Sequence, residues 1–194
     1  MSAALGYASL LGLVLAMGRW CQVRVVREYD EGGVLSIATV WLVWILYGLQ
    51  IAFVAVPAFR AWGGLPGPPL LWRLLGGLLV GGGVAFAAWG AASFHSLRRM
   101  NGRDISELVT AGAYRYSRNP QNVGIGAALV GVALLGPSSV ALAAAAIFWG
   151  MFGAYVPIEE RFLEATYGDR YRAYRRASHR YLGAVRMRGH DAAA

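Results

Sequence analysis

The chain has 194 residues, of which 57% are hydrophobic and only 14% are charged. Its mean hydropathy of +0.46 is too high for an ordinary water-soluble domain. One bilayer span takes about 20 apolar residues, so the chain has room for several spans. A large soluble catalytic domain is excluded. All 18 basic residues are arginine, and against 10 acidic residues they give a net charge of +8.

Cysteine content limits the chemistry further. The single cysteine, Cys21, excludes an intrachain disulfide and a thiolate metal cluster. We expect no metal site. The sequence has no motif typical of RNA or DNA binding, so we expect no nucleic-acid partner.

Two apolar runs open the chain. Residues 1–20 lack the basic start and the cleavage site of a secretory signal, so we expect an uncleaved first membrane helix. Residues 34–56 form a second run, which ends at Pro57, and a loop rich in proline and glycine follows. Residues 1–69 are therefore predicted to be a unit of two transmembrane helices.

Glycine marks the third apolar run, residues 70–94. Small residues let neighbouring membrane helices approach closely. We predict that this span packs tightly against another helix through its glycines, namely Gly76, Gly77, Gly81, Gly82, Gly83 and Gly90.

A polar loop and an apolar hairpin follow. Residues 95–119 hold five arginines and cannot lie in hydrocarbon. Residues 121–136 and 138–156 are apolar and separated only by Pro137, which predicts a helical hairpin over 120–156 with a short first arm.

The last segment, residues 157–194, is amphipathic. Its aromatic residues recur at helical spacing between arginines, which predicts a cytoplasmic tail on the membrane face with a break at Gly168 and Asp169. We expect disorder from Arg186 onward.

The fold class is therefore all-α: a polytopic membrane protein with about five transmembrane helices, a C-terminal helical hairpin and an interfacial amphipathic tail. Residues 70–194 form its core unit.

Arginine placement predicts the topology, because basic residues collect in cytoplasmic loops. Sixteen of the 18 arginines fall in residues 19–33, 94–120 and 157–194, and five spans place these three segments on one side. We expect the amino terminus outside and the carboxyl terminus inside. The same distribution explains the basic charge without nucleic acid.

Two polar segments flank the hairpin. Residues 108–120 lie immediately before it, and residues 159–163 lie immediately after it. A hairpin returns the chain to its starting side, so Arg118, Asn119 and Pro120 should meet Glu159 and Glu160 at the cytoplasmic interface.

These segments carry a resemblance to a known family. The motif Leu-Val-Thr-x-Gly-x-Tyr-x-x-x-Arg-Asn-Pro, the hairpin, and then Glu-Glu-x-x-Leu-x-x-x-Tyr-Gly-x-x-Tyr-x-x-Tyr resemble the isoprenylcysteine carboxyl methyltransferase and phospholipid methyltransferase superfamily of integral membrane enzymes. The chain departs from the family at Asn122, where tyrosine is usual, and at His179 and Gly183, where the family's tail usually has prolines.

The resemblance implies an enzyme that uses S-adenosylmethionine in a pocket facing the cytoplasm. We expect the protein in the cell inner membrane. It implies a catalytic role for Arg118 and Glu160, and we expect Glu160→Gln to weaken cofactor binding with folding nearly intact. The residues implied in cofactor binding are His95, Leu108, Val109, Gly112, Tyr114, Arg118, Asn119, Pro120, Glu159 and Glu160.

The acceptor is expected to be lipophilic and to enter from the bilayer between walls around Phe86, Trp89, Val123 and Phe152, with Asn122 selecting the headgroup. A prenylated carboxylate, phosphatidylethanolamine, a quinone, a phenol and a small thiol all remain open as acceptors. A non-catalytic membrane subunit is the alternative of a different class. In that case Glu159 and Glu160 would be a surface ion-pair cluster.

Overall fold

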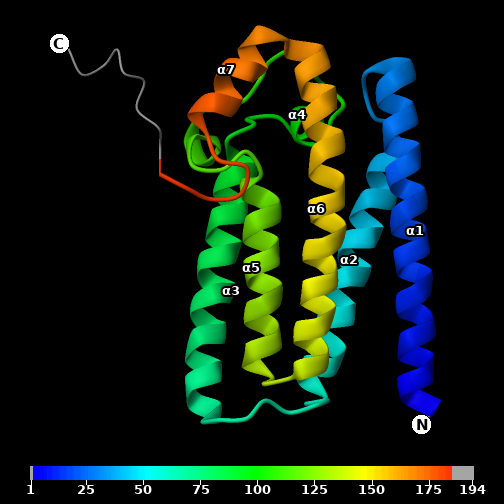
Figure 1. The fold of residues 1–194 in the computed structure, drawn as a ribbon, viewed down its shortest axis with the longest axis vertical. Coiled ribbons are helices and arrows are strands. Elements are labelled where there is room, and N and C mark those ends of the chain that lie inside the picture. Colours follow the sequence, from blue (N-terminus) through cyan, green and yellow to red (C-terminus); the bar gives the residue numbers. More distant parts are fainter. Residues whose placement is uncertain (1, 185–194) are drawn as a thin grey trace, which may run out of the picture.

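Residues 2–184 of the chain are described by a computed structural model, and Figure 1 shows their arrangement. Five long helices run up and down a bundle, and shorter elements cover one of its ends. The long helices are α1 (Ser2–Gly32), α2 (Ile37–Phe59), α3 (Pro69–Ala92), α5 (Pro120–Leu135) and α6 (Ser139–Tyr167). The shorter elements are α4 (Leu97–Met100), the 3-10 turn η1 (Gly112–Arg115) and α7 (Asp169–Ala177).

Among the described residues, four helices are long and apolar enough to cross a bilayer: α1 from Gly6, α2, α3 and α6. Helix α5 has 16 residues, or about 24 Å at 1.5 Å per residue, which is shorter than the hydrocarbon core. The all-α polytopic membrane fold expected from the sequence is confirmed, with α5 and α6 as its hairpin.

Helix α1 is longer than predicted. It continues past Trp20 to Gly32, so the predicted arginine loop over residues 19–33 is wrong. Arginine and glutamate are good helix formers, and Arg24 pairs with Glu28 one turn later, with 3.0 Å between Nε and Oε1. Glu28 also accepts a hydrogen bond from the Thr39 hydroxyl of α2 at 2.6 Å.

Helix α6 also extends beyond its predicted end. Pro157 lies inside it, and the helix ends only at Tyr167, so residues 157–167 are not the start of a separate tail. The predicted break is confirmed at Gly168, whose φ of +54° is a conformation that favours glycine. Helix α7 begins at Asp169. The disorder expected from Arg186 onward falls outside the described residues.

The two ends of the bundle differ in structure. At one end, the turn between α2 and α3 is fastened to the turn of the hairpin. The Ser139 amide donates to the Gly63 carbonyl at 2.7 Å, and the Leu65 amide donates to the Pro137 carbonyl at 2.9 Å. The opposite end carries the α1–α2 turn, residues 93–119 and α7 (Figure 1). The predicted polar loop and the carboxyl-terminal segment therefore lie at the same end.

Helices α3 and α5 pack through glycine. Glycines spaced by seven residues face the partner backbone: a Cβ added at Gly76 would lie 2.7 Å from the Gly131 carbonyl oxygen. A Cβ at Gly83 would lie 2.5 Å from the Gly124 carbonyl oxygen. Gly82 has no such neighbour within 4 Å. Only part of the predicted glycine set therefore makes the contact, and this part holds α5 against α3.

Gly83→Ala should lower the free energy of unfolding by about 1–3 kcal/mol, because the new methyl group overlaps backbone that no side-chain rotation can move. Gly82→Ala is the matched control, and we expect it to leave stability unchanged or slightly raised, since alanine favours helix. Thermal unfolding of both variants in detergent measures the difference. Equal unfolding temperatures would contradict the close α3–α5 contact.

Candidate active site

A cavity of about 290 Å³ lies at the end of the bundle that carries α7. Helices α1, α2, α5 and α6 form its walls, and residues 99–109 with α7 cover it. Seven of the ten residues expected to bind a cofactor line this cavity: Leu108, Val109, Tyr114, Arg118, Asn119, Glu159 and Glu160. The two polar segments that flank the hairpin therefore meet here.

The other three expected residues lie outside the cavity lining. His95 is exposed just after α3, with a φ of +52°. Gly112 begins the 3-10 turn, and a Cβ there would meet the Ser93 side chain. Pro120 is the first residue of α5, where its fixed φ suits a helix start, and it packs against Gly90.

Arg118 and Glu160 are joined by an ion pair across the hairpin. The Arg118 Nε and Nη2 atoms donate to Glu160 Oε1 at 3.0 and 2.8 Å. Both side chains are more than nine-tenths buried. Arg180 completes the group, since its Nη2 donates to Glu160 Oε2 at 2.6 Å. We call Arg118, Glu160 and Arg180 the arginine clasp.

The clasp fastens the segment after α7 to the segment before α5. Arg118 Nη1 donates to the Ser178 carbonyl at 2.7 Å, and its backbone amide donates to the His179 carbonyl at 2.8 Å. The Asn119 side-chain amide donates to the Arg180 carbonyl at 2.9 Å. Because this carboxylate holds two arginines, one of them buried, we expect Glu160→Gln to lower stability as well, which the sequence alone did not suggest.

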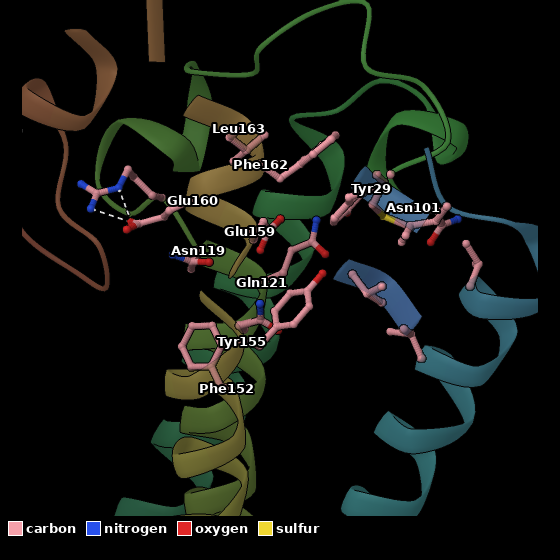
Figure 2. Close-up of a pocket in the computed structure, with 18 of the residues that line it drawn as sticks. Tyr29, Asn101, Asn119, Gln121, Phe152, Tyr155, Glu159, Glu160, Phe162 and Leu163 are labelled. Atoms are coloured by element: carbon pink, nitrogen blue, oxygen red, sulfur yellow. Dashed lines mark hydrogen bonds and ion pairs between the residues drawn. The ribbon is translucent and has the colours of Figure 1, made fainter. Parts of the chain in front are cut away.

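Glu159 has a different environment from its neighbour. Successive residues on a helix point about 100° apart, so Glu159 and Glu160 face different sides of α6. Figure 2 shows Glu159 in the pocket close to Gln121 and Tyr155, whereas Glu160 points away toward its arginine. Glu159 is the carboxylate of the pair that faces open space.

Two buried donors beside the cavity make no hydrogen bond within the described part of the chain. Among the described residues, the buried side-chain polar atoms without a hydrogen bond are the Tyr171 hydroxyl and Arg99 Nε. Both residues line the cavity. Arg99 Nη1 binds Glu107 at 2.8 Å, but its Nε lies 3.7 Å from Asp104, too far for a hydrogen bond.

The Tyr171 hydroxyl is a proton donor at neutral pH. Burial and then the nearby Glu160 carboxylate raise the pKa of Tyr171. A buried donor without a partner destabilises the folded state, so natural proteins retain few of them. Each of these donors suits a ligand group that accepts a hydrogen bond.

Several lining residues were missed in the sequence. Tyr29 of α1 stacks on Phe162 of α6 with ring centroids 3.8 Å apart, which forms one aromatic wall. Tyr47 of α2 hydrogen-bonds to the Asn122 side chain of α5. Arg180 was also missed, because an arginine among other tail arginines has no distinguishing spacing. No local motif marks these residues, which come together only through the packing of α1, α2 and the tail.

The predicted acceptor walls agree with the cavity only in part. Phe152 lines it, whereas Phe86, Trp89 and Val123 do not. Helix α5 lies between α3 and the other helices, and the glycine contact closes the space beside α3. The open space is therefore on the side of α1 and α2.

Comparison with known proteins gives the family. A family model described as phospholipid methyltransferase matches residues 71–170, which is more than half of the chain. Protein-S-isoprenylcysteine O-methyltransferase A of Arabidopsis thaliana is 38% identical over 84 residues, which are 42% of this chain and 42% of that protein. The match therefore spans less than half of that relative. No solved structure matches significantly. Because the family model covers both polar segments and the hairpin between them, the chain belongs to the phospholipid methyltransferase family.

Proposed function

We propose that this chain is an integral membrane enzyme that transfers a methyl group from S-adenosylmethionine to a lipophilic acceptor. One observation carries the proposal: Glu159 faces a cavity whose cover holds two buried donors without a hydrogen bond and whose walls reach into the apolar bundle. Family membership supports the reaction type.

The residues present fit S-adenosylmethionine. This molecule carries an ammonium group, a carboxylate, ribose hydroxyls and a positively charged sulfur. Glu159 suits the positive groups, while the Tyr171 hydroxyl and Arg99 Nε suit the carboxylate or ribose. Leu108 and Val109 supply backbone groups beside the cavity for the adenine. When bound, S-adenosylmethionine supplies a methyl group activated by its positive sulfur.

The protein then orients the reactants and excludes water. A methyl transfer is a single displacement, so alignment of the two reacting atoms is the main requirement and no protein nucleophile is needed. Arg118 and Glu160 act as positioning residues, since the clasp holds residues 178–180 against side chains that line the cavity. Tyr174 assists by donating from its hydroxyl to the Tyr114 carbonyl at 2.8 Å.

This assignment keeps the seven expected residues that line the cavity and sets aside His95, Gly112 and Pro120, which lie outside its lining. The Arg118 and Glu160 side chains bind one another, so we assign direct contact with the cofactor's charged groups to Glu159. Asn119 holds the tail through its bond to the Arg180 carbonyl.

The acceptor class follows from the surroundings of the cavity. Three of the helices that form its walls, α1, α2 and α6, can cross a bilayer, so a lipophilic acceptor can enter sideways from the lipid. The family description favours a phospholipid, and the Arabidopsis relative's name favours an isoprenylcysteine. We place the protein in the cell inner membrane with the cavity facing the cytoplasm, because arginines gather at that end.

Binding of S-adenosylmethionine to the purified chain in detergent, measured by calorimetry, tests the proposal. Tyr171→Phe should weaken binding about three- to tenfold through loss of one hydrogen bond. The same change should leave stability equal or higher, because it removes an unsatisfied buried hydroxyl. Tyr174→Phe is the control: it breaks an existing bond and should lower stability by about 1 kcal/mol. A parent chain that binds no S-adenosylmethionine at millimolar concentration would contradict the proposal.

A further inference from the structure

The cavity continues beyond the part of the chain that the family model matches. Residues of α1 and α2, all before residue 71, line its membrane side together with α6. We call this part the inner arm and define it by Gly18, Cys21, Gln22, Gln50, Phe148 and Met151. Most residues of the inner arm belong to α1 and α2, which lie outside the part of the chain that the family model matches.

Two amide side chains in the inner arm have weak partners. Gln22 of α1 donates to the Met151 backbone carbonyl at 3.3 Å, a long hydrogen bond to an atom inside helix α6. Gln50 of α2 donates to the Met151 thioether sulfur at 3.1 Å, and a thioether is a poor acceptor. Both side-chain amides can therefore form a stronger hydrogen bond with a better acceptor.

The location of these two amides is unusual for weakly bonded polar groups. Gln22 and Gln50 lie within helices that can span a bilayer, where a poorly satisfied polar group costs several kcal/mol. Either position filled by leucine would pack against Met151 without that cost. Two amides from different helices that converge on one residue beside a cavity point to a polar group of a ligand.

The distance from the candidate methyl-transfer point follows from helix geometry. Met151 precedes Glu159 by eight residues on α6, which is about 12 Å along the helix axis. Tyr155 and the Tyr47–Asn122 hydrogen bond line the cavity between these levels. A ligand that reaches both levels has two polar ends separated by about 12 Å.

We propose, on the basis of the proposed function, that the inner arm is the acceptor subsite. Gln22 and Gln50 hydrogen-bond a second polar group of the acceptor, an ester or amide carbonyl about 12 Å from the methyl-accepting atom. The acceptor is therefore an amphipathic lipid with a carbonyl linkage, and a bare prenyl or alkyl chain attached to the reactive group does not satisfy this subsite.

The test begins by incubating the parent chain with radiolabelled S-adenosylmethionine and a total lipid extract of the organism from which the chain comes. The labelled product is identified by mass spectrometry and used as acceptor for the variants Gln22→Leu and Gln50→Leu. Each should raise the KM for that lipid about three- to tenfold, with kcat and S-adenosylmethionine affinity close to those of the parent. Ile51→Leu, on the exposed side of α2, is the matched control and should leave KM unchanged.

Cys21 offers a readout that is independent of turnover. It is the chain's single cysteine and lines the inner arm. The same purified lipid at saturating concentration should slow labelling of Cys21 by N-ethylmaleimide. Unchanged labelling would place the lipid elsewhere and overturn the subsite.

The remaining outcomes separate the two proposals. A labelled lipid whose body is hydrocarbon only, or leucine variants with the KM of the parent, would overturn the carbonyl-binding subsite and leave the methyltransferase proposal intact. No label in any lipid from the parent chain would instead overturn transfer to a lipophilic acceptor.

Discussion

Glu160→Gln is expected to lower the free energy of unfolding by about 3–5 kcal/mol, because it leaves Arg118 buried without its counter-ion. The same change breaks the bond to Arg180, so the residues after α7 lose their attachment to the cavity. Thermal unfolding of the detergent-solubilised chain measures the loss. We expect methyl transfer to fall with it, because the cover of the cavity is no longer held.

Glu164→Gln is the matched control for this change. Glu164 lies one turn further along α6 and pairs with Arg175, which is 46% exposed. A pair this accessible contributes at most about 1 kcal/mol. If Glu160→Gln and Glu164→Gln unfold at the same temperature, the clasp does not hold the fold. Arg118→Met combined with Glu160→Gln should recover part of the loss, because no unpaired buried charge remains.

Glu159→Gln is expected to weaken S-adenosylmethionine binding about ten- to a hundredfold, with the folded state as stable as in the parent. The charge-assisted hydrogen bond that it removes contributes about 1.5–3 kcal/mol. Stability should hold because Glu159 faces the cavity and not the clasp. Calorimetry measures the affinity, and thermal unfolding of the same sample measures stability.

The variants of the two adjacent glutamates therefore serve as controls for one another. One should affect ligand affinity and the other should affect folding, although they differ by one position on the same helix. Asp169→Asn, at an exposed carboxylate that lies outside the cavity lining, is a further control and should change S-adenosylmethionine binding little. Parent-like affinity in Glu159→Gln would show that this carboxylate does not contact the cofactor.

Much of the site was predictable because of one topological fact. A short hairpin returns the chain to its starting side, so Arg118 and Glu160 had to be neighbours. The glycines of the third span likewise predicted a close helix contact. Spacing did not tell which glycines face α5, because that depends on the rotation of α3 about its axis.

Other features depend on packing that no local pattern records. Residues 19–32 contain charges, which suggested a loop, but Arg24, Glu28 and Thr39 satisfy one another and the helix continues. Pro157 suggested a helix end, but it lies inside α6. The different roles of Glu159 and Glu160 depend on which side of α6 the tail covers, and Arg180 reaches that side from 20 residues away.

Transfer of radiolabelled methyl groups from S-adenosylmethionine tests the central claim most directly. The purified chain is incubated with the labelled cofactor and a total lipid extract of the host, beside the aqueous metabolites of the same cells. The proposed function predicts label that partitions into organic solvent and that is lost in Glu159→Gln at limiting cofactor. Label found only in water-soluble products, or none in either fraction, would contradict a membrane methyltransferase with a lipophilic acceptor.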